Sequence, residues 1–155
     1  MEPRAAELIR SLQLVPHPEG GFYRRVFESA QRLPGGRACA SAILFLLPAG
    51  VVGRWHRLDV EELWHFYEGA PLQLWIAEAS QSLRSELLGP VGVDCLPQRA
   101  VPAQSWQASR SCGGFTLVGC TLSPAFEFAG FTLLAEDDQA RRAWPHLERL
   151  HPEFL

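Results

Sequence analysis

Short alternations of hydrophobic and polar residues run along most of the chain, after a single helical pattern at its start. In residues 3–12, apolar side chains recur on one helical face, which predicts a short amphipathic helix that begins at a proline. From residue 23 onward, short apolar runs are separated by glycine and proline, a pattern typical of an antiparallel β-sandwich or barrel. The expected strands cover residues 23–29, 40–47, 62–67, 72–78, 83–88, 98–101, 106–109, 115–121 and 131–134.

The two ends of the chain depart from this strand pattern. Residues 16–21 predict an irregular loop, because two prolines flank His17 and two glycines follow Glu19. After Asp137 a charged segment, interrupted by a proline, predicts a helical tail. Residues 1–155 are expected to fold as one domain, which at this length buries a core without disulfides or a structural metal.

Composition argues against several kinds of partner. With 17 acidic and 14 basic residues, the formal charge is -3, so no basic surface for nucleic acid is expected. The longest apolar run, residues 38–50, is too short to span a bilayer, and the first residues do not resemble a signal peptide. We therefore expect a soluble cytoplasmic protein that binds neither nucleic acid nor membranes.

Two residue types narrow the available chemistry. All 14 basic residues are arginine, and the absence of lysine excludes a Schiff-base nucleophile, a covalent pyridoxal phosphate site and a P-loop. The four cysteines show no metal-binding or redox spacing, so they are expected to pack as small, reduced side chains.

Potential chemistry is concentrated in residues 50–69, GVVGRWHRLDVEELWHFYEG, where histidine, glutamate and aromatic residues lie in one strand-like segment. Side chains two apart in a strand share a face, so Glu62, Trp64 and Phe66 form one row. His65 lies on the opposite face and is not expected to share a site with Glu62.

The spacing of this segment resembles the first motif of the cupin superfamily. Its positions are Gly50, His56, Leu58, Glu62 and Gly69, and only Leu58 departs from the motif. Further blocks follow in the order of the cupin-5 family, formerly a domain of unknown function; they are residues 16–24, 55–57, 62–66, 106–108 and 117–121. The resemblance spans residues 12–134. It implies an all-β, jelly-roll-like cupin barrel with a small-molecule pocket, commonly a homodimer, and it establishes no activity.

The cupin register implies that the Glu62 row points into the barrel, with His56 beside it. The expected pocket residues are His56, Glu62, Trp64, Phe66 and Gln107, with Trp106 contributed by the same block as Gln107. In a purely structural alternative, His56 and Glu62 only form an ion pair in the core. The aromatic residues expected in the core by default are Trp75, Phe126 and Phe128.

Metal-binding cupins carry further histidine ligands that this chain lacks. Leu58 stands at one of these positions and has no donor atom, and Gln107 stands at another. A tight transition-metal site needs three good ligands, and an amide oxygen is a poor one. No metal or other cofactor is expected; a divalent metal, if present, would use His56, Glu62 and Gln107.

The loop near the start of the chain is a second group of candidates. His17, Glu19, Tyr23 and Arg24 are expected to close the mouth of the pocket, with Arg24 suited to bind a carboxylate or phosphate. Alternatively, the loop is a rigid dimer arm. Arg25 stands where many members of the family carry an acid, so no argument from that acid applies here.

Three functions remain open on these residues. The first is a metal-independent enzyme on a small polar, sugar-like metabolite, similar to cupin epimerases and isomerases. In it His56 is the general base, Glu62 orients His56, and Tyr23 or Tyr67 supplies a proton. The second is a non-catalytic ligand-binding or sensor cupin, and the third is a metal-dependent dioxygenase or isomerase. In each case the expected partners are a small-molecule ligand and a second copy of the chain.

Overall fold

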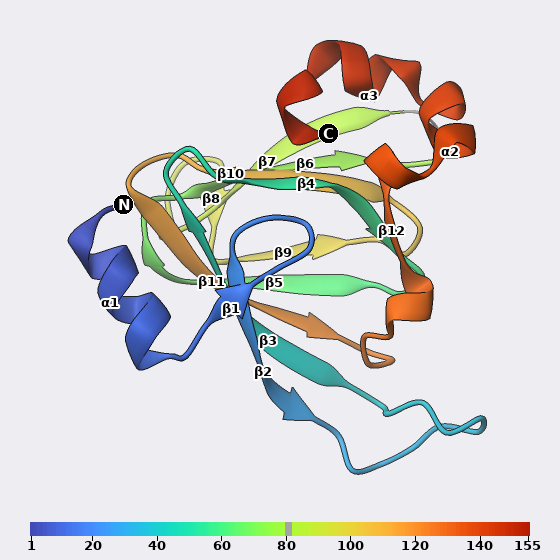
Figure 1. The fold of residues 1–155 in the computed structure, drawn as a ribbon, viewed down its shortest axis with the longest axis horizontal. Helices are drawn as coiled ribbons and strands as arrows, with labels where there is room; N and C mark the ends of the chain where they lie inside the picture. The colour runs from blue at the N-terminus through green and yellow to red at the C-terminus, as the bar shows by residue number, and fades with distance from the viewer. Residues whose placement is uncertain (80–81) are drawn as a thin grey trace.

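Two six-stranded sheets face each other in the computed structural model, which describes residues 1–79 and 82–155 (Figure 1). The first sheet contains, in spatial order, β1 (Val15–Pro16), β2 (Phe22–Glu28), β3 (Ser41–Pro48), β11 (Phe115–Leu122), β5 (Glu62–Gly69) and β9 (Gln98–Val101). The second contains β12 (Phe131–Leu133), β4 (Val52–Leu58), β10 (Trp106–Ser111), β6 (Leu72–Ala77), β7 (Leu83–Leu88) and β8 (Cys95–Leu96). The pairings are antiparallel apart from the short β7–β8 pair. The prediction of an all-β, jelly-roll-like fold is confirmed.

Helices lie at the two ends of the chain, as predicted. The first helix, α1 (Pro3–Ser11), starts at its proline and packs against the outer face of the first sheet. The tail contains α2 (Asp138–Ala143) and α3 (Pro145–Leu150). Three short 3-10 helices accompany them: η1 (Phe128–Gly130), η2 (Leu134–Glu136) and η3 (Pro152–Phe154). Within the described part of the chain, no helix has the length and apolar character needed to cross a membrane.

The apolar core fills one part of the space between the sheets. Phe45 and Trp64 from the first sheet pack there against Leu74 and Ile76 from the second. A separate cluster lies on the outer face of the second sheet, where the C-terminal helices cover Trp55, Trp75 and Trp106. This division places the polar residues of β4 and β5 at the other end of the space between the sheets, where the candidate site lies.

Candidate functional site

A cavity of about 430 Å³ lies between the two sheets, beside the apolar core. This volume is typical of sites for small molecules. Its walls come from β2, β3, β4, β5 and β11, together with the loop that contains His17 and Glu19. Phe126 and Phe128 also line it, and Phe128 is 62% exposed, which marks this end of the cavity as its mouth. The expectation that Phe128 belongs to the core is therefore wrong, whereas Phe126 is half-buried against a small core cluster and Trp75 is buried as expected.

One wall carries Glu62, from β5 of the first sheet. Gln107 donates a hydrogen bond from Nε2 to Glu62 Oε2 at 2.6 Å, and Trp64 donates from Nε1 to Gln107 Oε1 at 3.1 Å. Burial raises the pKa of Glu62 to about 7, although hydrogen bonds from Gln107, Cys120 and Trp64 oppose the rise. Glu62 therefore exchanges a proton near neutral pH.

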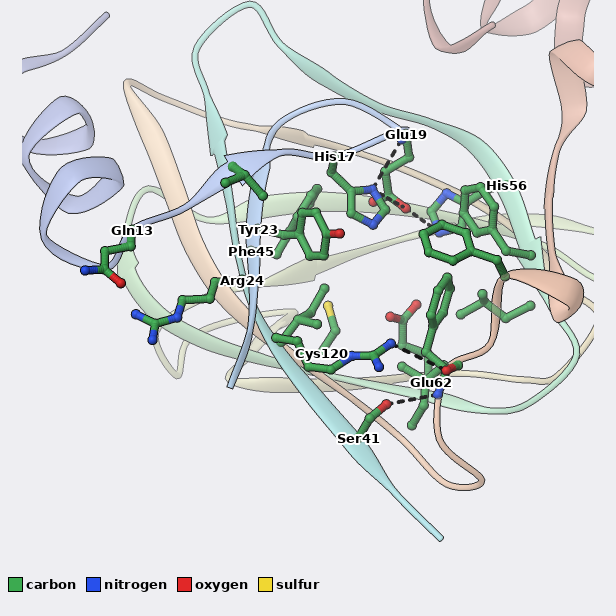
Figure 2. A pocket seen from close by; sticks show the side chains of 18 residues that line it. Gln13, His17, Glu19, Tyr23, Arg24, Ser41, Phe45, His56, Glu62 and Cys120 are labelled. Atoms are coloured by element: carbon green, nitrogen blue, oxygen red, sulfur yellow. Dashed lines mark hydrogen bonds and ion pairs between the residues drawn. The ribbon is translucent and has the colours of Figure 1, made fainter. Parts of the chain in front are cut away.

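The opposite wall carries a glutamate and two histidines (Figure 2). Glu19 Oε2 lies 3.2 Å from His56 Nε2, and His56 Nδ1 donates to the Arg54 carbonyl at 2.8 Å. Burial and the nearby Glu62 carboxyl raise the pKa of Glu19 well above its usual value, while burial lowers the pKa of His56 to about 4. Both shifts favour the neutral form of this pair, in which the proton is on Glu19 and is donated to His56 Nε2.

His17 completes this wall in a defined tautomer. The Glu19 backbone N–H donates to His17 Nδ1 at 3.2 Å, so the proton of the neutral ring is on Nε2. The ring of Tyr23 meets the ring of His17 edge-on, with the centroids 4.5 Å apart. Burial, reinforced by His56, lowers the pKa of His17 to about 4. His17 is therefore a neutral hydrogen-bond donor at physiological pH.

Close backbone packing places Glu19 in the cavity. Gly20 has φ of 112°, and a Cβ atom at this position would collide with the carbonyl oxygen of Val52. A Cβ atom at Gly53 would collide with Ser109 Oγ. The Glu19 carbonyl accepts from the Arg54 N–H at 2.8 Å, which fixes the loop against β4. Only glycine allows this approach, and the approach delivers a carboxyl group to His56.

The structure therefore changes one predicted partnership. We expected Glu62 to orient His56, and this expectation is wrong because Glu19 contacts the His56 ring. The proposed role of His56 as a free general base loses its support, since both ring nitrogens are engaged within the protein. Six predicted residues do line the cavity, namely His17, Glu19, Tyr23, Arg24, His56 and Glu62.

Several predicted pocket residues lie elsewhere. Trp64 and Gln107 are buried behind Glu62, and Phe66 packs against the apolar core. Trp106 lies on the outer face of the second sheet, where the Arg57 guanidinium is 5.0 Å from its ring centroid. The expectation that these four side chains line the cavity is therefore wrong.

The two side chains predicted for the other face of β5 lie outside the cavity. Tyr67 is about half exposed and packs over Gly119, so it is a wrong candidate for the proton donor. The prediction for His65 is confirmed, because its Nε2 lies 3.1 Å from Thr121 Oγ1 on the outer face. Sequence reasoning missed Cys120, whose predicted role was packing; its thiol borders the cavity and its pKa is raised by burial.

The donor set at the cupin metal position does not fit a transition metal. Leu58 lines the cavity without a donor atom, and the amide of Gln107 is already bonded to Trp64 and Glu62. Within residues 1–79 and 82–155, no three His, Cys, Asp or Glu side chains are arranged to hold a metal ion. Metal-dependent cupin chemistry therefore finds no ligand set in these side chains.

Two antiparallel sheets face each other, and His56 from β4 and Glu62 from β5 line the cavity between them. This arrangement is that of a cupin. The chain belongs to the cupin superfamily family DUF985, whose model matches residues 6–134. This match confirms the resemblance seen in the sequence. A search of curated proteins found no match.

Solved structures extend the comparison. A Shewanella oneidensis protein is 33% identical to the chain, with a TM-score of 0.88 and coverage of 97% of this chain and 96% of that one. A hypothetical protein from Leishmania major is 30% identical, with a TM-score of 0.85 and coverage of 97% of both chains. Oxalate decarboxylase from Bacillus subtilis is 11% identical, with a TM-score of 0.62 over 90% of this chain and 36% of that one. This last likeness shows the fold alone.

Proposed function

We propose that the protein is a metal-independent epimerase or isomerase that moves a proton at a carbon next to a carbonyl group in a small polar metabolite. One observation carries this proposal: groups that accept and donate protons line opposite walls of one cavity (Figure 2). Glu62 comes from the first sheet, whereas Glu19 is held against His56 of the second. Inversion at a carbon needs a base on one face and an acid on the other, and this arrangement provides both.

In the proposed reaction, the Glu62 carboxylate removes the proton from carbon, and the electron pair of the C–H bond moves onto the carbonyl oxygen. His17 Nε2–H and the Tyr23 hydroxyl, which both belong to the cavity lining, donate hydrogen bonds to this oxygen, where negative charge develops. Glu19 then returns a proton to the carbon from the opposite face. Glu62 ends as a carboxylic acid and Glu19 as a carboxylate, so the number of protons is unchanged and the reverse reaction exchanges their roles.

The pKa values suit this division of roles. A general base is most effective when its pKa lies near the working pH, and the pKa of Glu62 is about 7. A general acid must carry a proton, and burial favours the protonated Glu19 carboxyl by raising its pKa well above its usual value. His56 acts as a positioning residue, because its Nε2 holds the Glu19 proton in place.

The test is isotope exchange in heavy water. The probes are two ketoses, erythrulose and fructose, each as a single enantiomer, and their charged derivatives erythrulose phosphate and fructuronate. We expect deuterium to enter at the carbon next to the carbonyl, with inversion at that carbon, and to do so in the presence of a chelator. General-base catalysis is worth ~10²–10⁴-fold, so Glu62→Gln should lower the exchange rate by that factor. Glu68→Gln, an exposed position on the same strand, is the matched control.

Two results would count against the proposal. If no compound of this panel exchanges above the uncatalysed rate, the epimerase or isomerase function is wrong; tight binding without exchange would instead indicate a non-catalytic binding or sensor protein. If exchange occurs and Glu62→Gln leaves it unchanged, Glu62 is not the base. Loss of exchange on chelation would favour the metal-dependent alternative.

A further inference from the structure

Two arginines line the cavity that carries the acid and base groups. In β2, Tyr23 pairs with Phe45 and Arg25 pairs with Ile43 of β3, and all four residues line the cavity. Arg25 therefore lies on the inward face of the strand, one step closer to the mouth than Tyr23. Arg24 reaches the rim from the same strand and is exposed. Arg25 therefore places a positive charge at the mouth, beside Phe126, and Arg24 adds a second one on the part of the rim near Gln13 (Figure 2).

The contacts of Arg25 hold its guanidinium in place without using all of its donors. Its Nη1 donates to Glu28 Oε2 at 2.8 Å, and its Nη2 faces the Phe126 carbonyl at 3.5 Å. The guanidinium also lies 5.9 Å from the centroid of the Phe126 ring. A guanidinium has five N–H donors in a planar fork, so donors remain for a carboxylate or phosphate.

Arg24 is less constrained than Arg25. It donates one hydrogen bond, from Nη1 to the Leu12 carbonyl at 3.2 Å. Throughout the described ranges, 1–79 and 82–155, no carboxylate forms an ion pair with it. An arginine charge of this kind is available to an anion from solution.

The charges of the cavity favour an anion over a cation. Burial raises the pKa of Glu19 well above its usual value and lowers the pKa of His17 and of His56 to about 4, so it disfavours the charged form of all three groups. Glu62 is the acid in the wall with a pKa near 7, and the same cavity is lined by Arg24 and Arg25. The lining therefore combines two guanidinium groups with two carboxyl groups whose pKa values are raised, a set that favours an anionic ligand over a cationic one.

We propose that the substrate is an anion whose carboxylate or phosphate group binds Arg25 at the mouth of the cavity, with Arg24 as a second cation. The carbon skeleton then extends inward past Phe126 and places the carbon next to the carbonyl between Glu62 and Glu19. This placement of the reacting carbon rests on the proposed function, whereas the anion site rests on the arginines alone.

Calorimetric titration with paired probes tests the inference. The phosphate arm compares erythrulose phosphate with erythrulose, and the carboxylate arm compares fructuronate with fructose. In at least one arm, the anion should bind the unmodified protein roughly tenfold to a hundredfold more tightly than its neutral partner, since hydrogen bonds to charged groups are worth that much. The arm with the larger ratio identifies the charged group of the natural substrate.

Variants locate the site. Arg25→Gln should abolish most of the preference for the anion while changing the affinity for the neutral partner about twofold or less, because only the charged group is lost. Arg32→Gln is the matched control, since Arg32 bonds the other oxygen of the same Glu28 carboxylate from an exposed position. Arg24→Gln should reduce the preference by a smaller factor.

The possible results separate this inference from the proposed function. The anion site is overturned if the two members of each pair bind with equal affinity. It is also overturned if none of the four probes binds. An equal effect of Arg25→Gln and Arg32→Gln overturns it as well. Exchange of neutral ketoses as fast as charged ones would leave the acid–base function standing without the anion site. Anion binding through Arg25 with no exchange would leave the anion site standing without the proposed reaction.

Discussion

Replacing Glu62 with glutamine should stabilise the protein at high pH and change its stability little at low pH. Glu62 is 6% exposed, and burial raises the pKa of its carboxyl group from 4.5 to about 7. In the unfolded chain the same group ionises near its ordinary pKa, so the folded state binds more protons between these two values. The free energy of unfolding therefore falls as the pH rises from the unfolded pKa through the folded one.

The size of this effect follows from the change in proton affinity. A pKa raised from 4.5 to about 7 corresponds to an upper value of about 3 kcal/mol, since each tenfold change in affinity is worth about 1.4 kcal/mol. Glutamine has nearly the same shape as glutamate, carries no charge, and retains an oxygen that can accept the hydrogen bond from Gln107 Nε2. The measured gain will be smaller wherever the neighbouring Glu19 also responds to the lost charge.

Urea unfolding of the unmodified protein and Glu62→Gln, at about pH 4 and about pH 8, measures the difference directly. We expect nearly equal stability at the lower pH and a gain of up to about 3 kcal/mol for the variant at the higher pH. Glu68→Gln is the control on the same strand, and it should gain nothing at high pH because a hydrogen bond from Arg4 lowers the pKa of Glu68. A gain for Glu62→Gln that is the same at both pH values would refute the reasoning.

Two further predictions concern the support of Glu62 and the assembly of the chain. Trp64→Phe removes the donor that holds Gln107 against Glu62, so it should raise the pKa of Glu62 and shift the pH profile of deuterium exchange upward; an unshifted profile would contradict this role. Because Val26 and Phe27 are each 52% exposed on β2, we expect a homodimer that covers them. Light scattering should give twice the mass of the chain, and a monomer at all concentrations would disprove the dimer.

The alternation of apolar residues predicted most of the fold and left out one strand that carries chemistry, a strand that only the cupin resemblance implied. Apolar alternation identified β3, β5, β6 and β11 because each has one face in the core. The missed strand is β4, where Gly53, Arg54 and Arg57 interrupt the alternation. The Arg54 N–H donates to the Glu19 carbonyl, and the Arg57 guanidinium lies over the Trp106 ring. Both contacts join residues far apart in the sequence, so local periodicity does not reveal them.

Alternation also predicted which face of the sheet a side chain occupies, but not whether that side chain lies in the cavity or in the packed core. Glu62 and Trp64 share the inward face of β5, as expected, yet Glu62 reaches the cavity while Trp64 lies in the packed part of the core. Side-chain period fixes which sheet face a residue occupies, but the position of the cavity along the strand depends on how the second sheet packs above it. The same limit explains why Gln107 was expected in the wall and lies behind it.

The partner of His56 was predicted wrongly for a related reason. Glu62 is near His56 in the sequence and in the motif, whereas Glu19 comes from a distant loop. What brings Glu19 to His56 is the contact of Gly20 with Val52, and no feature of either segment alone indicates it. The two glycines after Glu19 were visible in the sequence and predicted an irregular loop, but not the direction of its carboxyl group.

The cavity electrostatics link the two proposals through Glu62. Two buried carboxyl groups that influence each other do not both ionise readily; the contact with neutral His56 favours the protonated form of Glu19, so the ionisable charge falls to Glu62. An anionic substrate placed beside Glu62 would raise the pKa of this base further and hold it protonated. The Arg25 guanidinium at the mouth offsets that repulsion, because it neutralises the charge of the substrate before the substrate reaches the acid–base groups. A cavity that uses a buried carboxylate as a base on an anionic metabolite therefore needs a cation at its entrance, and β2 supplies Arg25.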